Sequence, residues 1–455
     1  MPTTLLWLRR DLRLDDLPAL GAAHDAADGG RVLPVFVLDP RLLEESAVRT
    51  HCLLSALESA QQAYDGAIVL RTGDPEQVVP DLVREIDASS VHISAESTPF
   101  GRRRDAAVRE ALPEGVPLVA TGCAYAVGPG TIRNGSGDPY QVFTPFSRAW
   151  REHGWPDPAP VPKDLRWHRQ AESEGMPDRP DLGDVQLPEV GEEAAHQRWE
   201  AFLGDDVTAY DEERDRADHD RTSQMSVHLK YGTIHPRTLL ADLRGRRDKG
   251  AHTFATELAW REFYADVLWQ QPASAWSDLK PALRGMSYDD PETDDGVAQA
   301  MQAWREGRTG YPFVDAGMRQ LLAEGWMHNR LRMVTASFLV KHLHVWWPHG
   351  ARHFMQQLRD GDIASNNHGW QWVAGTGTDA APYFRVFNPV TQGERFDPSG
   401  DYVRRYLPEL RHLAGKAAHQ PWGADDGYAQ GYPERIVEHK EAREEALRRY
   451  EAARS

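Results

Sequence analysis

The N-terminal third of the chain alternates short apolar runs with segments of helical periodicity. Five runs have the length and composition of buried strands: 5–8 (LLWL), 32–38 (VLPVFVL), 67–70 (AIVL), 91–94 (VHIS) and 117–120 (PLVA). Between them, segments such as 49–64 and 75–86 repeat apolar residues every three or four positions, which is typical of amphipathic helices. This alternation predicts a doubly wound, mostly parallel sheet, so we expect an α/β domain over residues 1–128.

The remainder divides into a connector and a helical region. Residues 129–194 are rich in Pro, Gly and Asp, as in WPDPAPVPKDL, which predicts a surface connector with little regular structure. From 195 to 455 the periodicity is helical, with Gly, Pro and Asp at the breaks and almost no strand signal. The expected fold class is therefore an α/β domain joined to an all-α domain.

Charge and cysteine content limit the function classes. The formal net charge of −17 argues against a non-specific nucleic-acid coat protein, although a local basic groove remains compatible with it. Cys52 and Cys123 are the only cysteines, which favours a reducing compartment. The N-terminus lacks a signal-peptide pattern and no apolar stretch reaches about 18 residues, so we expect a cytoplasmic protein without a membrane span.

The segment ELAWREF places three chemically distinct side chains together. Glu257, Trp260 and Arg261 are spaced i, i+3 and i+4, so on a helix they share one face. The alternative is an ordinary amphipathic helix with a Glu–Arg surface pair, because this spacing is common.

The segment GWMHNRLRM is a second candidate. Asn329, Arg330 and Met333 can line one patch of a helix, and its arginines have few carboxylates nearby in sequence. A phosphate-facing role is one interpretation. Solvated arginines at a helix N-terminus are the other.

The segment RDGDIASNNHGW concentrates acids, amides and an indole. On a helix, Asp362, Asn366 and Trp370 lie along one side, with Asp360 a turn away. Carboxylates in a dry pocket need partners, and the hydroxyls and ring nitrogens of a ligand could supply them. A calcium loop is disfavoured because the EF-hand spacing and closing glutamate are missing, and we expect no metal site.

Two further patterns are expected to be decoys. GTGTDA (375–380) approaches a dinucleotide fingerprint, but no strand precedes it, so we predict a loop. His342, His344, His349 and His353 include an HxxxH pair without the glutamate of a zinc protease, and we predict surface histidines.

Together with VDAGMRQL and TGTDAAPYFRVFNP, the three segments resemble the DNA photolyase/cryptochrome family, and within it the class I cyclobutane pyrimidine dimer photolyases. The likeness extends over nearly the whole chain. It implies an antenna-binding α/β domain (1–128), a connector (129–194) and a helical domain (195–455) that binds FAD and DNA.

The resemblance implies a set of FAD-binding positions. The diphosphate would lie against Tyr210 and the segment Thr222, Ser223, Gln224, Met225 and Ser226, where many relatives have Arg or Gly in place of Gln224. Other matching positions are Asn329 and Arg332, Asp360 and Asp362 for the ribityl, ribose and ring edge, Asn366 facing flavin N5, and the helix face of Glu257, Trp260 and Arg261.

The resemblance also implies a substrate, UV-damaged DNA with a flipped-out dimer. The matching dimer-facing positions are Glu257, Trp260, Arg261, Asn329, Met333 and Trp372, with Arg214 and Arg330 toward the phosphates. Excited FADH⁻ would pass one electron to the dimer, which would split, and Glu257 would stabilise the dimer radical anion. We expect a monomeric lyase without an obligate protein partner.

Two alternatives remain: a cryptochrome-like photoreceptor that binds FAD without repair, and a flavin-binding structural protein without catalysis. Asn366 favours repair, because plant-type cryptochromes tend to carry Asp at this position and animal types often Cys. The intact dimer-facing residues favour repair as well.

Two further features follow from the likeness. Trp370 and Trp347 match the first two members of a three-tryptophan electron path, but the third position departs from the pattern, with Tyr288 or another surface tryptophan as the candidate donor. ESTPFGRRRD (96–105) resembles the branch with an 8-hydroxy-5-deazaflavin antenna more than the one with methenyltetrahydrofolate, and Phe36, Arg49, Glu96 and Phe100 would line that pigment.

Overall fold

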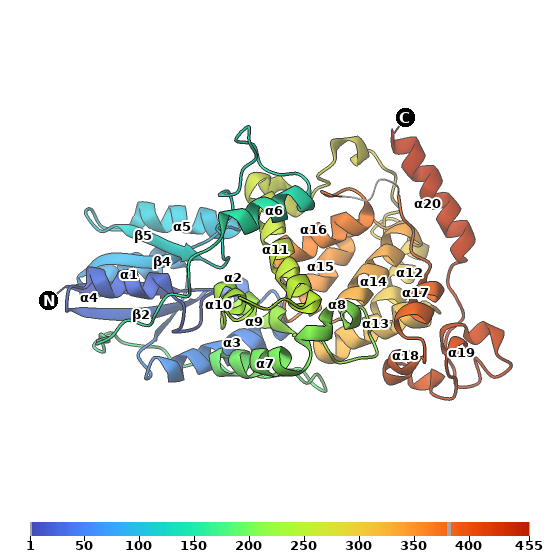
Figure 1. Ribbon diagram of the computed structural model, residues 1–455, viewed down its shortest axis with the longest axis horizontal. Coiled ribbons are helices and arrows are strands. Elements are labelled where there is room, and N and C mark those ends of the chain that lie inside the picture. Colours follow the sequence, from blue (N-terminus) through green and yellow to red (C-terminus); the bar gives the residue numbers. More distant parts are fainter. Residues whose placement is uncertain (1, 380–383, 455) are drawn as a thin grey trace.

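The computed structural model describes residues 2–379 and 384–454. It contains the five predicted strands as one parallel sheet in the order β3-β2-β1-β4-β5. The strands are β1 Thr3–Leu8, β2 Arg31–Leu38, β3 Val69–Thr72, β4 Ala88–Ala95 and β5 Leu118–Cys123. The helices of this domain are α1 Pro18–Ala26, α2 Pro40–Leu43, α3 Ala47–Ala63, α4 Pro75–Ile86 and α5 Pro99–Ala111. The predicted doubly wound domain is confirmed, and it forms the left half of Figure 1.

Alternation along β1 explains why helices cover both faces of the sheet. Leu6 and Leu8 pack in one core with residues of α1 and α3, whereas Leu5 and Trp7 pack in another with residues of α4 and α5. The strand order reverses between β1 and β4. In open parallel sheets, ligands bind outside the carboxyl ends of the strands at such a switch point.

The connector is less irregular than its composition predicts. Helix α6, Phe143–His153, lies inside it and buries Phe143, Phe146 and Trp150. Their spacing of three and four residues is a helical signal, but the surrounding Pro and Gly residues concealed it. These side chains pack in a core with residues of α11, Lys249–Gln270.

The C-terminal part is helical, as predicted, and it fills the right of Figure 1. Besides α11, its α-helices are α7 Glu192–Asp205, α8 Tyr210–Glu213, α9 Met225–Tyr231, α10 Pro236–Asp242, α12 Asp295–Arg305, α13 Pro312–Glu324, α14 Asn329–Lys341, α15 Trp347–Gln357, α16 Ile363–Ala374, α17 Pro389–Phe396, α18 Asp401–Tyr406, α19 Lys416–His419 and α20 His439–Arg454. Among the described residues, no helix combines the length and apolar content that crossing a membrane requires. The GTGTDA segment follows the end of α16, so it begins as a loop without a preceding strand, while residue 380 lies outside the described residues.

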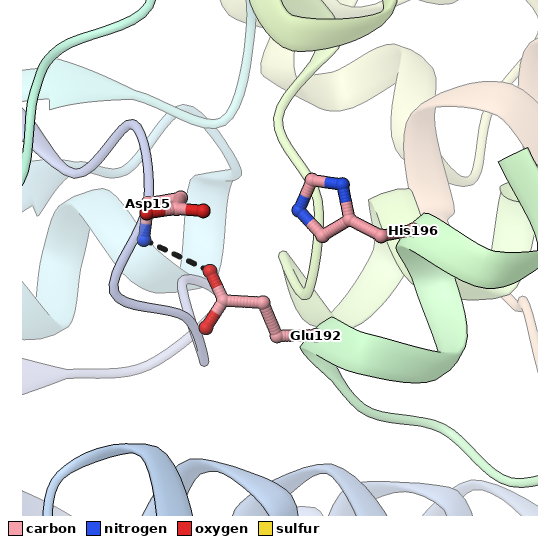
Figure 2. A group of neighbouring side chains, drawn as sticks. All are labelled: Asp15, Glu192 and His196. Carbon is pink, nitrogen blue, oxygen red and sulfur yellow. Dashed lines mark hydrogen bonds between the residues drawn. The ribbon is translucent and has the colours of Figure 1, made fainter. Parts of the chain in front are cut away.

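Polar contacts join the two domains. The buried Asp16 carboxylate contacts His235 Nδ1 at 3.0 Å and also pairs with Arg237. Nearby, Glu192 at the start of α7 accepts the backbone N–H group of Leu14 at 2.9 Å. It also accepts the backbone N–H group of Asp15 at 2.8 Å, which Figure 2 shows as a dashed line.

Figure 2 also shows His196 beside that contact. Ligand atoms of Asp15, Glu192 and His196 lie within 4.8 Å of one another, a spacing that could hold a metal ion. Both Glu192 oxygens already accept backbone N–H groups. We therefore regard Glu192 as a structural link between the domains.

The prediction of surface histidines in the segment KHLHVWWPHGARHF is wrong for two of the four, whereas His344 and His349 are partly exposed. His342 and His353 are buried, and burial lowers their pKa values to about 3 and about 4. His342 Nε2 lies 2.8 Å from Nδ1 of His439, the first residue of α20. The segment joins two core helices, α14 and α15, which a polar composition does not reveal.

Candidate functional site

Asp362 links α16 to the other domain. As N-cap of α16 it accepts the Ser365 backbone N–H at 3.1 Å, and its second oxygen accepts a hydrogen bond from Arg10 Nη2 at 2.8 Å. Burial acts to raise its pKa, but the positive charges of Arg10 and Lys230 outweigh burial and lower it. Asn366 and Trp370 follow on successive turns of the same helix, as the spacing predicted.

Asp360 lies in the loop before α16, and only one of its two carboxylate oxygens has an ordinary hydrogen bond. Its Oδ2 accepts a hydrogen bond from Arg332 Nη2 at 2.8 Å, and this guanidinium lowers the pKa of Asp360 against the effect of burial. Its Oδ1 is buried and has no hydrogen bond of ordinary geometry among the described residues, although the Ser226 hydroxyl also lowers the pKa of Asp360. Such an atom is costly unless a donor completes it, and a sugar hydroxyl of a bound cofactor has the right chemistry.

The segment 222–226 is fixed from two sides. The Arg198 guanidinium on α7 donates hydrogen bonds to the carbonyls of Thr222 and Ser223, the latter at 3.1 Å. Gln224 precedes α9 in a left-handed conformation (φ 53°), and its side-chain oxygen accepts a hydrogen bond from Arg359 Nη2 at 2.8 Å. A glycine in place of Gln224 would adopt this backbone conformation freely, but it would lack the side-chain oxygen that Arg359 contacts. The segment is therefore tied to the loop that carries Asp360.

Met225 is buried at the start of α9, whereas Ser226 is exposed. Sequence reasoning missed Arg198, because nothing in the pattern HQRWEAF distinguishes it from an ordinary helix arginine.

The α11 face brings Glu257 together with Arg214. The two side chains form an ion pair, and burial nevertheless raises the pKa of Glu257 above its ordinary value. Tyr210 is close enough to be affected by this pair. Burial raises the pKa of Tyr210, and the negative charge of Glu257 raises it further. Its ring packs edge-on against Phe202 and Phe254, each at 5.5 Å between centroids. An acid, a guanidinium and a phenol therefore converge here.

The other two residues of ELAWREF differ in their surroundings. Trp260 stacks on Phe143 of α6, with ring centroids 3.6 Å apart and planes 8° apart, and remains partly exposed. Arg261 points to the domain junction, where it donates hydrogen bonds to the carbonyls of Ala124 at 2.8 Å and Leu229 at 3.3 Å. Sequence reasoning missed Phe143, because it lies in the segment expected to be irregular.

The start of α14 sends its two arginines to different carboxylates. Arg330 Nη2 lies 2.8 Å from Asp215 Oδ1, and its guanidinium covers the Phe396 ring. Arg332 reaches Asp360. These acids are distant in sequence, so the lack of carboxylate neighbours within GWMHNRLRM was misleading. Asn329 is exposed at the first helical position.

Met333 on α14 and Trp372 on α16 are both partly buried and pack against the largest hydrophobic core. Asn366 uses its amide N–H groups within the protein, donating to Ala351 O at 3.1 Å and to Asn367 Oδ1 at 2.8 Å. Among the described residues, its own side-chain oxygen accepts no recorded hydrogen bond.

A second group of charges meets at the switch point of the sheet. Arg10 follows β1 and Glu96 follows β4, and Arg10 Nη1 lies 3.8 Å from Glu96 Oε1. Lys230 of α9 interacts with both of them and with Asp362, and burial lowers its pKa to about 7. No recorded hydrogen bond involves the Lys230 ammonium among the described residues.

The other expected antenna residues surround this edge. Phe36 is buried near the end of β2, and Phe100 on α5 lies under the Arg41 guanidinium at 5.5 Å. Arg49 on α3 pairs with Glu45 at 2.9 Å.

Trp370 and Trp347 lie on neighbouring helices. A Cβ atom at Gly350 would come 2.2 Å from the Trp370 ring, so glycine allows α15 and α16 to pack closely. Trp347 is fully buried, and its indole N–H donates to Asp278 at 2.8 Å. Trp370 Nε1 is buried without a hydrogen-bond partner among the described residues.

Comparison with known families gives two matches. The family model for DNA photolyase matches residues 4–163, and the model for the FAD binding domain of DNA photolyase matches residues 254–452. The second range contains Glu257, Asp360 and Asp362. An acid with an open oxygen, such as Asp360, has the chemistry to accept a hydroxyl of a dinucleotide such as FAD.

Curated relatives match over the full length. The chain is 41% identical to a deoxyribodipyrimidine photo-lyase of Halobacterium salinarum (99% of each chain) and 39% identical to that of Streptomyces griseus (100% of this chain and 99% of the relative).

Solved structures share the fold. A class III photolyase from Agrobacterium tumefaciens matches with a TM-score of 0.90 at 35% identity, covering 100% of this chain and 98% of that one. A Synechocystis cryptochrome matches with a TM-score of 0.89 at 27% identity (98% and 99%). A photolyase from Sulfolobus tokodaii, solved with two FAD molecules, matches with a TM-score of 0.84 at 27% identity (99% and 100%). With this similarity along its whole length, the chain belongs to the DNA photolyase family.

Proposed function

We propose that this protein is a deoxyribodipyrimidine photo-lyase that repairs cyclobutane pyrimidine dimers in DNA with light. The observation that carries the proposal is the buried, unpartnered Asp360 oxygen beside Arg332, within the range that matches the FAD binding domain. No nucleophile or metal is required at such a site, because a flavin supplies the electron chemistry and the protein positions it.

FAD would be held by residues whose chemistry suits its parts. Asp360 Oδ1 would accept a sugar hydroxyl, and the segment Thr222 to Ser226, held by Arg198, would lie along the diphosphate. Asn366 would offer its free side-chain oxygen to the flavin ring. When bound, reduced FAD (FADH⁻) supplies one electron on excitation and takes it back.

The residues that would face the dimer contribute apolar contact, a hydrogen bond and contacts to the phosphates. Trp260, Met333 and Trp372 provide apolar surface for the two fused bases. Glu257, whose pKa burial raises, would hydrogen-bond the pyrimidine edge and stabilise the negative charge that develops there. Photolyases are among the enzymes known to flip their target base out of the duplex, which costs a few kcal/mol and less for a damaged base. Arg214 and Arg330 would face the phosphates.

Repair by a class I enzyme is favoured over photoreception. Glu257, Trp260, Met333 and Trp372 are only partly buried, so an acid and apolar side chains suited to a dimer remain accessible, which supports repair. A class III photolyase and a cryptochrome share this fold, so the fold alone does not distinguish the classes. The class I assignment is supported instead by the motif MHNRLRM and by Asn366. We further propose a monomer in a reducing compartment.

For the antenna we propose 8-hydroxy-5-deazaflavin at the switch point of the sheet. Lys230 and Arg10 would pair with an acidic ring hydroxyl there, next to Glu96. An extra absorption band near the violet-blue edge, distinct from that of FAD, would support a deazaflavin. A folate spectrum, or release of a second FAD as named for the Sulfolobus protein, would overturn it.

The test of the main proposal is a light-dependent repair assay. The purified, FAD-loaded and reduced protein is incubated with an oligonucleotide that contains one thymine dimer, and intact thymines are counted after blue light or darkness. We expect repair in blue light alone. Repair in darkness, or none under light with FAD bound, would refute the proposed function.

A further inference from the structure

Trp347 needs a neighbour that connects it to solvent. Its side chain is fully buried, so a reductant dissolved in water cannot reach it. If Trp370 and Trp347 carry electrons toward the flavin, as the proposed function implies, another redox-active side chain must stand between Trp347 and the surface. The inference below therefore rests on the proposed function.

Trp346, the preceding residue, contacts Trp347 directly. The two ring centroids are 6.4 Å apart with planes at 68°, an edge-to-face arrangement. Unlike Trp347, Trp346 is only partly buried. It is therefore both a neighbour of the buried indole and open to water.

One carboxylate holds both indoles. Asp278 accepts the Trp347 N–H at Oδ1, 2.8 Å away, and the Trp346 N–H at Oδ2, 3.1 Å away. Asp278 is itself 5% exposed. In this poorly solvated setting, a negative charge next to both rings stabilises a positive charge on either one, which is the state an indole reaches after losing an electron.

The alternative aromatic donors have specific disadvantages. Oxidation of a phenol releases its proton, yet the Tyr288 hydroxyl is buried without a hydrogen-bond partner among the described residues, and burial raises its pKa. Trp276 lies under the Arg352 guanidinium at 5.1 Å, and this positive charge opposes a second one. The Trp304 ring centroid lies 6.1 Å from that of Trp370, but Trp304 is fully buried, so it cannot accept an electron from a reductant in solution.

We propose that Trp346 is the solvent-facing electron donor of this protein and that Asp278 positions Trp346 and Trp347. Trp370 loses one electron to the light-excited flavin, Trp347 replaces it, and Trp346 replaces that of Trp347. A soluble thiolate then returns one electron to Trp346, and two thiyl radicals combine to a disulfide. One electron enters at Trp346 for each that leaves at Trp370.

The test compares Trp346→Phe with wild type and with Trp422→Phe. Trp422 is a matched control, since it is also partly buried but packs against Tyr311 and Arg435. With oxidised FAD bound and a thiol present, the rate of flavin reduction in blue light is measured by absorbance. We expect it to fall about tenfold or more in Trp346→Phe, a change equivalent to about 1.4 kcal/mol, and to stay unchanged in Trp422→Phe.

A second readout follows the radical itself. After a laser flash, the tryptophan radical should decay faster in Trp346→Phe, because the charge stays on buried Trp347 next to the flavin path. Asp278→Asn should shorten its lifetime as well. A radical lifetime and a rate of flavin reduction equal to wild type in Trp346→Phe would overturn the inference. A slower flavin reduction seen in Tyr288→Phe but not in Trp346→Phe would overturn it as well.

The proposed function fails in a different way. Protein reduced chemically in the dark bypasses the tryptophans, so Trp346→Phe should then repair dimers at the wild-type rate. Absence of repair by chemically reduced wild type would refute the repair function, whatever the tryptophan variants do.

Discussion

At the scale of single residues, Asp360 and Asp362 have different surroundings although they are two positions apart. Asp362 is completed within the chain by Ser365 and by Arg10, 352 positions away, whereas Asp360 keeps one open oxygen. The sequence predicts that such acids need partners, because unpaired buried carboxylates are costly. It does not identify Arg10, since that contact exists only after the domains meet.

Glu257 offers the most specific residue test. Glu257→Ala should lower the number of dimers repaired per absorbed photon about tenfold, the effect of losing one hydrogen bond to a charged group. Flavin content should stay that of wild type, and Glu306→Ala, at an exposed glutamate, is the control. Loss of flavin together with repair would mean that this helix face holds the cofactor instead of the dimer.

Arg330 tests the contact with DNA. If Arg330 meets a phosphate, Arg330→Gln should weaken binding equally for damaged and undamaged DNA and reduce the slope of log affinity against log salt by about one. Titrations at several salt concentrations measure this slope. The control is Arg308→Gln, at an exposed position. An unchanged slope would remove Arg330 from the interface.

At the scale of elements, α11 combines two roles that its sequence only partly reveals. Its i, i+3, i+4 pattern predicts a helix and the Glu257 face. On the other side, Glu262 accepts hydrogen bonds from the backbone of Ala126 at 2.6 Å and Val127 at 3.0 Å, and from Trp150 Nε1 at 2.7 Å. Trp150 belongs to helix α6 of the connector, which a Pro- and Gly-rich composition concealed, whereas Ala126 and Val127 lie just before the connector.

Glu262 gives this element a pH-dependent stability. Burial raises its folded-state pKa from 4.5 to about 7, so the folded protein holds the proton more tightly than the unfolded chain. The associated stability is complete below pH 4.5 and is lost as pH rises through about 7, by an amount on the order of 3 kcal/mol.

Urea unfolding of wild type and Glu262→Gln at several pH values isolates this contribution. Glutamine does not titrate, so the stability of wild type relative to the variant should decline from pH 4.5 to 7. If the difference in unfolding free energy between wild type and Glu262→Gln does not vary with pH, the raised pKa of Glu262 is contradicted.

At the scale of the whole molecule, the two-domain layout follows from periodicity alone, since strand-helix alternation and helical repeats are local signals. The joining of the domains does not, because Asp16, His235 and Arg237 are ordinary residues until they meet. The buried histidines were missed for the same reason.

Four other buried histidines predict that the fold is sensitive to acid. Burial lowers several histidine pKa values from 6.5 to about 4, so the unfolded chain binds protons first and stability is lost as pH falls from 6.5 toward 4. The residues are His228, His235, His328 and His368. The melting temperature at pH 5 should therefore lie below that at pH 7, and an equal or higher value would contradict neutral buried imidazoles.

The most direct measurement is a crystal structure of the protein with reduced FAD and a duplex that contains one thymine dimer. The account predicts a sugar hydroxyl of FAD on Asp360 Oδ1 and the extruded dimer against Glu257 and Trp260. FAD bound away from Asp360, or a dimer that stays stacked in the duplex, would contradict it.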